Sequence, residues 1–145
     1  TPGGSTNSMF VVRSNSVGLY CEGATFNGGN IGYGIHFDDI SDSDFVIRDC
    51  TFQDFDLGIY MIGDSGAYIQ NVEIYDSTMN SNDDNGIYLL YVNNSIIQGN
   101  LVDDNSDQGI YLYHTNYIAV EDNNITNNLD SGIYIHYTDY PWRSK

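Results

Sequence analysis

The chain alternates short apolar runs with clusters of Asn, Asp, Ser and Gly, and this pattern repeats. Residues 86–108 read GIYLLYVNNSIIQGNLVDDNSDQ, and residues 109–131 follow without a gap as GIYLYHTNYIAVEDNNITNNLDS. Eight of the 23 positions are identical between the two copies, and most of the others conserve their apolar or polar character. An internal repeat of this length indicates stacked structural units.

Each copy has the two-residue alternation of strands and the residues typical of turns. At 109–113, the isoleucine and leucine would point to one side of a strand and the two tyrosines to the other. Apolar positions at 118–120 and at 125 predict a second and a third strand. Three short strands without a helix between them predict one coil of a parallel β-helix, with coils about 4.8 Å apart.

The same strand can be followed along most of the chain. Its five versions start at glycines spaced by 24, 28, 23 and 23 residues: Gly34-Ile35-His36-Phe37, Gly58-Ile59-Tyr60-Met61, Gly86-Ile87-Tyr88-Leu89, Gly109-Ile110-Tyr111-Leu112 and Gly132-Ile133-Tyr134-Ile135. Phe10-Val11-Val12 is an earlier version without the glycine. The sequence therefore predicts an all-β, single-domain parallel β-helix of about five coils with three short strands per coil.

The expected boundaries are a polar leader at 1–8, coils at 9–136 and a cap or tail at 137–145. The extra residues of the 28-residue coil are expected in a longer turn at 63–66. After Ile135 the period is expected to end, with Pro141 and Trp142 folding over the last coil as a cap. The alternative is that the segment is a piece of a longer β-helix.

The two cysteines are expected to be separate. In a register without gaps, Cys21 aligns with Ile47 in an inward column, and Cys50 aligns with Ser77 at a turn. We therefore expect no disulfide, and two buried free thiols that act as small core residues.

Charge narrows the range of partners. The 145 residues include 20 acidic and 4 basic side chains, which gives a net charge of −16. Such a surface repels nucleic acid and anionic membranes and attracts metal cations, so nucleic-acid binding is excluded. No apolar run approaches the ~20 residues of a membrane span. A composition rich in Asn, Ser, Thr and Tyr with almost no Lys predicts an extracellular, cell-surface or virion-surface location.

The GIY…N…N…D period, over residues 9 to 136, resembles the right-handed parallel β-helix repeats of the pectate-lyase-like fold. Polysaccharide lyases, glycoside hydrolases, uronan epimerases, phage tailspikes and surface adhesins share that fold. The resemblance implies the right-handed β-helix, whereas it leaves the activity open because members without known catalysis have the same architecture.

An outward aromatic row is the first candidate site. If the isoleucines point inward, the alternate side chains of the same strands face outward, beginning with His36. The residues predicted to bind a ligand on this face are Tyr60, Tyr88, Tyr111, Tyr113, Tyr134 and His136. Tyrosine rings suit the apolar faces of sugars, and their hydroxyls supply hydrogen bonds. The alternative is that the row only stabilises the sheet through aromatic contacts.

An acidic column is the second candidate. Its members each lie two residues before a strand glycine: Asp56, Asp84, Asp107 and Asp130. Like charges on neighbouring coils are unfavourable unless a cation lies between them or their pKa values rise, so a Ca²⁺ site is predicted here. The alternative is Asx-turn chemistry, in which each Asp accepts a backbone N–H.

Amide side chains form a third column, which we interpret as structural. Stacked amides can hydrogen-bond along the axis of a β-helix, and the candidates are Asn82, Asn100, Asn105, Asn123 and Asn128, with Ser77 and Cys50 on earlier coils.

Catalytic candidates are His36, Asp38 and Tyr60. Glycoside hydrolysis requires two carboxylates on opposite sides of a bond, and a lyase requires a base with a cation that neutralises a uronate. The sequence assembles neither set. A module that binds polysaccharide is therefore preferred to a structural rod, with self-association through its coil ends, and to a polysaccharide lyase, hydrolase or epimerase.

Overall fold

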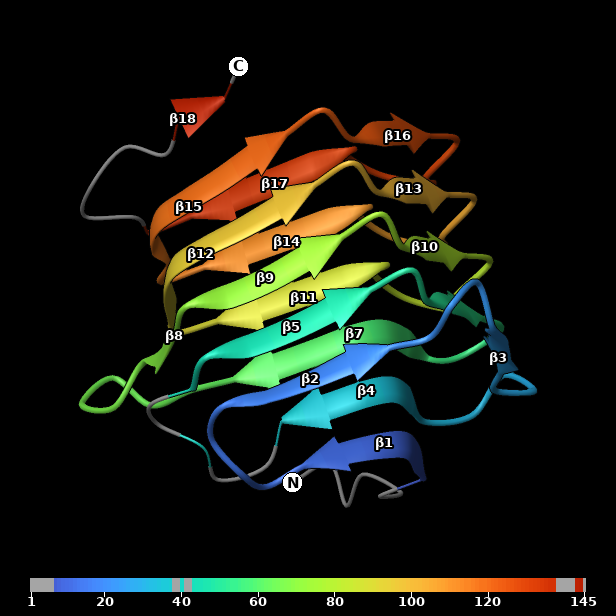
Figure 1. Cartoon of the computed structure of the whole chain (residues 1–145). Helices are drawn as coiled ribbons and strands as arrows, with labels where there is room; N and C mark the ends of the chain where they lie inside the picture. Colours follow the sequence, from blue (N-terminus) through green and yellow to red (C-terminus); the bar gives the residue numbers. More distant parts are fainter. Residues whose placement is uncertain (1–6, 38–39, 41–42, 138–142, 145) are drawn as a thin grey trace.

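The computed structural model describes residues 7–37, 40, 43–137 and 143–144, and within them every regular element is a β-strand (Figure 1). The strands form three parallel sheets that run along one axis. Sheet A contains β1 (Ser8–Val12), β4 (Tyr33–Phe37), β7 (Leu57–Ile62), β11 (Ile87–Leu90), β14 (Ile110–Tyr113) and β17 (Ile133–His136).

The other two sheets complete each coil. Sheet B contains β2 (Val17–Tyr20), β5 (Phe45–Arg48), β9 (Val72–Tyr75), β12 (Val92–Gln98), β15 (Asn116–Glu121) and β18 (Arg143–Ser144), with β8 (Ile69–Gln70) beside β12. Sheet C contains β3 (Thr25–Asn27), β6 (Thr51–Gln53), β10 (Thr78–Asn80), β13 (Leu101–Asp103) and β16 (Asn124–Thr126).

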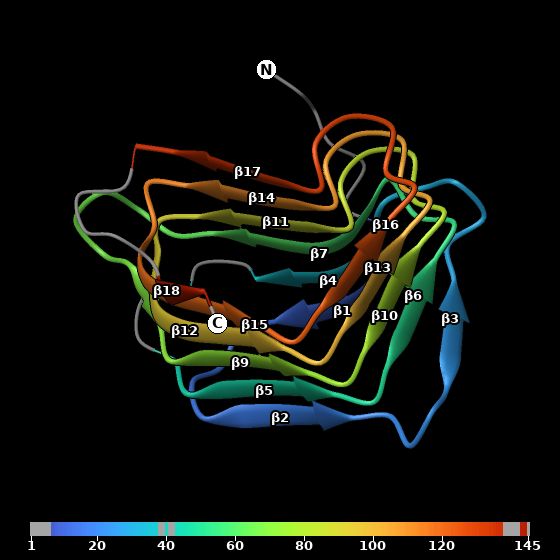
Figure 2. The same cartoon turned by 90° about the horizontal axis from the view of Figure 1, so that it is seen from above.

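The chain visits the sheets in the order A, B, C on every coil (Figure 2). Seen from the end where β17 and β18 lie, it turns counter-clockwise while it advances toward the viewer, so the β-helix is right-handed. The predicted fold, about five coils of three short strands, is confirmed.

The predicted register of sheet A is also confirmed. Ile87 pairs with Ile59 and Ile110, and Tyr88 pairs with Tyr60 and Tyr111. The isoleucines of this column are fully buried from the second coil to the fifth, whereas the tyrosines lie on the outer face. The close packing of successive coils requires glycine before the buried isoleucine of β4, β7, β11 and β14. A Cβ at Gly86, for example, would lie within 3 Å of the Gly109 carbonyl oxygen and of Val102.

The amide column is a hydrogen-bonded ladder, as the sequence indicates. The Asn82 backbone N–H and side-chain amide both donate to Oδ1 of Asn105, at 3.1 and 2.8 Å, and Asn105 repeats this arrangement with Asn128. Asn105 Nδ2 also donates to the Met79 carbonyl at 3.1 Å. A second ladder joins Ser77, Asn100 and Asn123. These bonds satisfy backbone groups at the coil corners, which would otherwise be buried without a partner.

The expectation of two free cysteines is wrong, because Cys21 and Cys50 form a disulfide. Leu19 pairs with Ile47, whereas the gap-free alignment had placed Cys21 there. Thr25 pairs with Thr51 further along, so the corner of the first coil holds two more residues than the corner of the second. This insertion moves Cys21 out of the inward column and brings its Cα to 4.9 Å from that of Cys50.

Beyond Ile135 the structure describes one more short strand, and the expected cap or tail at 137–145 stays a prediction. Strand β18 pairs with β15, so Arg143 lies beside Ala119 and the chain continues onto the next rung of sheet B. Residues 138–142, which include the expected cap at Pro141 and Trp142, lie outside the described residues. The longer turn at 63–66 is confirmed, since Asp64 and Ala67 form an isolated antiparallel bridge there.

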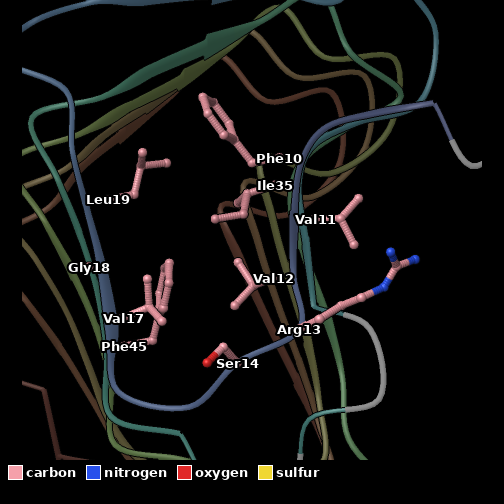
Figure 3. A pocket seen from close by; sticks show the side chains of 10 residues that line it. All are labelled: Phe10, Val11, Val12, Arg13, Ser14, Val17, Gly18, Leu19, Ile35 and Phe45. Atoms are coloured by element: carbon pink, nitrogen blue, oxygen red, sulfur yellow. The ribbon is translucent and has the colours of Figure 1, made fainter.

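The inward columns are open at the first coil. A hollow of about 250 Å³ lies there between β1 and β2. Phe10, Val12 and Leu19 point into it, whereas Val11 and Arg13 point away (Figure 3). No predicted site residue lines this hollow, and self-association through the coil ends stays a prediction.

Replacing Asn105 with Ala should lower the free energy of unfolding by about 2–4 kcal/mol, because it leaves the Asn82 N–H and the Met79 carbonyl buried without partners. The matched control is Asn124→Ala at an exposed position of β16, which should change stability by less than about 0.5 kcal/mol. Urea denaturation measures both. Equal effects of the two substitutions would contradict a stabilising ladder.

The disulfide should appear as a Cys21–Cys50 cross-linked peptide in a digest mapped without reductant. Because it closes a loop of 29 residues, its reduction should lower stability by about 3–4 kcal/mol through loop entropy in the unfolded chain. Thermal unfolding with and without reductant measures this loss. Two alkylatable thiols in the folded, unreduced protein would rule out the bond.

Candidate functional site

The outer face of sheet A carries a continuous aromatic row, which we call the tyrosine strip and define as His36, Tyr60, Tyr88, Tyr111 and Tyr134. Strands β4, β7, β11, β14 and β17 present one of these residues each, and all five pair in register. Ring centroids of successive members lie 5.3, 5.5, 4.9 and 5.2 Å apart. The predicted ligand-binding residues therefore form one row along the axis. Tyr113 and His136, also predicted, lie beside its upper end and contact each other at 5.3 Å.

The rings of Tyr88 and Tyr111 in the strip are stacked with an offset. The rings of Tyr88 and Tyr111 are parallel to within 3° at a centroid distance of 4.9 Å. A phenol ring with its hydrogens is wider than this, so two parallel rings cannot lie flat beside each other at that distance and must overlap partly face to face. The part of the strip formed by Tyr88, Tyr111 and Tyr134 is therefore not a row of open ring faces. It presents ring edges and hydroxyl groups to a ligand, and neighbouring rings cover much of each face.

The hydroxyl groups of Tyr60, Tyr88 and Tyr111 are held in the protonated form by raised pKa values. Burial, followed by the neighbouring Tyr33 and Tyr88, raises the pKa of Tyr60 to about 12. Burial also raises the pKa values of Tyr88 and Tyr111, with further contributions from adjacent tyrosines and from Asp84 and Asp107 respectively. A protonated phenol donates one hydrogen bond and accepts others. The strip is therefore a row of hydrogen-bond donors repeated on each rung.

The four predicted metal ligands follow one edge of sheet A, but each has its own contacts. Asp56 Oδ2 accepts from the Gly32 N–H at 2.9 Å, and Asp130 Oδ2 accepts from Gln108 Nε2 at 2.7 Å. Burial and the adjacent Asp107 raise the pKa of Asp84. Among the described residues, no three His, Cys, Asp or Glu side chains converge as metal ligands. Calcium binding by this acidic column stays a prediction.

Sequence reasoning missed a second aromatic column at the corner that follows sheet A. Tyr91, His114 and Tyr137 stack there with centroid distances of 4.9 and 5.1 Å and interplanar angles of 10°. All three have left-handed backbones, with φ of 53°, 49° and 51°, which is unfavourable for residues with a Cβ. The spacing of 23 residues between them was the available signal, but it lies just outside the repeated GIYL motif.

Of the catalytic candidates, the structure brings two together. His36 and Tyr60 are register partners whose ring centroids lie 5.3 Å apart. Asp38 lies outside the described residues. The structure thus places an imidazole beside a phenol on the strip, and the catalytic roles of His36, Asp38 and Tyr60 stay predictions.

The chain belongs to a known family of β-helix proteins. The family profile described as "Periplasmic copper-binding protein (NosD)" matches residues 4–140. No curated protein and no solved structure gives a significant match. The part of the chain that the structure describes contains no helix long and apolar enough to cross a membrane.

Copper, which the family description implies, does not fit the residues described here. Proteins hold copper with His, Cys and Met side chains. Both cysteines are joined in the disulfide, and the side chains of Met61 and Met79 are fully buried in the core. Met9 is exposed, but it lies on β1, four rungs of sheet A from β14. His114 and His136 are neighbours, since the backbone N–H of His114 donates to the backbone carbonyl of His136 at 3.1 Å. No third His, Cys, Asp or Glu joins them within the described ranges. We therefore assign no function through copper.

Replacing Asp84 with Asn should raise the melting temperature at pH 7. The pKa of Asp84 is raised above its ordinary value of 3.8, so the folded state favours the neutral carboxyl. Its contribution to stability is present below that ordinary pKa and is lost as the pH rises through the folded pKa. Asn resembles the neutral form, so its advantage should shrink as the pH falls toward 3.8.

The matched control is Asp83→Asn at the adjacent exposed position, which should change the melting temperature little at either pH. Calorimetry at pH 7 and pH 4 measures both variants. A lower melting temperature for Asp84→Asn at pH 7 would contradict the repulsion between Asp84 and Asp107.

Proposed function

We propose that this member of the NosD family binds a polysaccharide along the tyrosine strip. The observation that carries the proposal is the row of phenol hydroxyls, one per rung, from Tyr60 on β7 to Tyr134 on β17. Pyranose units offer hydroxyls and ring oxygens as acceptors along an extended chain. A glycan lying parallel to the axis could engage successive rungs in the same way.

Because the tyrosine rings stack on each other, a bound glycan would contact the strip mainly through the phenol hydroxyls. Because the rings of Tyr88, Tyr111 and Tyr134 overlap, a sugar meets their edges and O–H groups rather than open faces. Tyr134 on β17 is more open, with 39% of its surface exposed, so it can also offer a face. Rings already fixed by their neighbours lose little side-chain entropy on binding, which favours affinity.

We also infer that the protein works outside the cytoplasm. The family description places the family in the periplasm. The Cys21–Cys50 disulfide supports the same inference, because structural disulfides persist in oxidising compartments and are rare in the cytosol.

Removing two hydroxyls tests the proposal. The double variant Tyr88→Phe, Tyr111→Phe keeps the ring stack and deletes two donors. It should weaken binding of a soluble β-1,4-linked hexasaccharide about tenfold, because each lost hydrogen bond contributes about 0.5–1.5 kcal/mol. Titration calorimetry measures the affinity. Binding should also strengthen with oligosaccharide length until the glycan spans the rungs of the strip.

The control is Tyr20→Phe, which removes a hydroxyl from a tyrosine on β2 in sheet B that is 63% exposed. It should bind like the unmodified protein. If the double variant also binds normally while Tyr88→Ala with Tyr111→Ala unfolds, the strip is a stabilising ladder and the proposal fails.

A further inference from the structure

The acidic column runs beside the tyrosine strip, because Asp84 and Asp107 each lie four residues before the strip tyrosine of the strand that follows. Those strands pair in register, so the carboxylates occupy the same place on successive rungs. Asp56 and Asp84 contribute, after burial, to the raised pKa of Tyr33. Asp84 contributes in the same way to the raised pKa of Tyr88, and Asp107 contributes to the raised pKa of Tyr111. The carboxylates therefore follow the strip rung by rung, on the side where the strands of sheet A begin.

The column is held in place by the backbone and is not free to move away. The Asp84 N–H donates to the Asp56 carbonyl at 2.8 Å, and the Asp130 N–H donates to the Asp107 carbonyl at 3.3 Å. The carboxylates of Asp56 and Asp130 are further fixed by Gly32 and Gln108. A ligand on the strip would therefore meet a fixed row of negative charge.

The described cations lie away from this border. Arg48 is on β5 in sheet B, where it pairs with Asp76 at 3.1 Å and lies over the ring of Tyr75. Arg13 follows β1, three rungs of sheet A before β11 and the adjoining Asp84. Arg143 belongs to β18, which pairs with β15 in sheet B. Within the described ranges, none of the three arginines belongs to the strands that carry the middle of the strip.

We propose that the acidic column makes the strip selective for neutral glycans and against polyuronates. This inference rests on the proposed polysaccharide binding. A uronan aligned with the strip would bring carboxylates beside Asp84 and Asp107, and like charges at an interface act as a repulsive element against the wrong ligand. Each facing pair should weaken binding about fivefold at low ionic strength, and salt should reduce this penalty.

The test compares oligomers that differ only at C6. Mannohexaose and β-1,4-hexamannuronate form one matched pair, and cellohexaose and β-1,4-hexaglucuronate form a second. By calorimetry in about 20 mM salt, the neutral member of a pair should bind at least about tenfold tighter, and the ratio should fall in about 0.5 M salt. Equal or tighter binding of the uronates would overturn the inference and leave the proposed function standing. Failure of all four oligomers to bind would overturn both.

Charge-removing variants separate the column from the overall charge. In the double variant Asp84→Asn, Asp107→Asn, the affinity for the neutral oligomer should exceed the affinity for the matching uronate by about threefold or less. Glu73→Gln with Glu121→Gln removes the same two charges from β9 and β15 in sheet B and should leave the ratio unchanged. Equal narrowing by both pairs would show that the net charge of −16, and not the column, sets the preference. No narrowing by the first pair would also overturn the inference.

Discussion

Parallel pairing of successive coils in one register is the interaction on which the rest of this structure depends. Once Ile87 lies between Ile59 and Ile110, the remaining strand residues of the coil also pair with residues of the neighbouring coils, 23 to 28 positions away in the sequence. Identical or similar side chains then form columns, so a property of one rung becomes a property of a whole face. The buried isoleucines, the amide ladders, the tyrosine strip and the acidic column all follow from this pairing.

The columns differ in whether placing similar side chains on top of each other in successive coils is favourable. Apolar side chains and amides gain from it, because Asn105 both accepts from Asn82 and donates to Met79. Carboxylates lose, because burial and the neighbouring Asp107 raise the pKa of Asp84. Tyrosines stack with partly overlapping faces. The outer face of sheet A therefore combines ordered donors with a fixed acidic border, and this combination suits a neutral, hydroxyl-rich ligand.

Membership of the NosD family and the chemistry of this chain agree in part. The family match covers nearly the whole chain, and the disulfide suits the periplasmic location in the family description. The copper of that description does not fit the described side chains, since the thiols are oxidised and Met61 and Met79 are buried. The exposed Met9 lies on β1, at the opposite end of sheet A from β17. A repeat fold allows such divergence, because its columns can change chemistry while the buried pairing stays the same.

The sequence alone was sufficient for the fold, the inward and outward columns and the amide ladders, because each depends on a period that is visible as repeated letters. It could not reveal the disulfide, since two inserted residues at the first corner shift Cys21 relative to Ile47 and no local pattern marks an insertion in a degenerate repeat. The parallel stacking of Tyr88 on Tyr111 and the stack of Tyr91, His114 and Tyr137 were likewise decided by tertiary structure. Ring orientation and left-handed corners depend on side-chain contacts between coils, and a linear pattern specifies which residues align but not how their side chains pack.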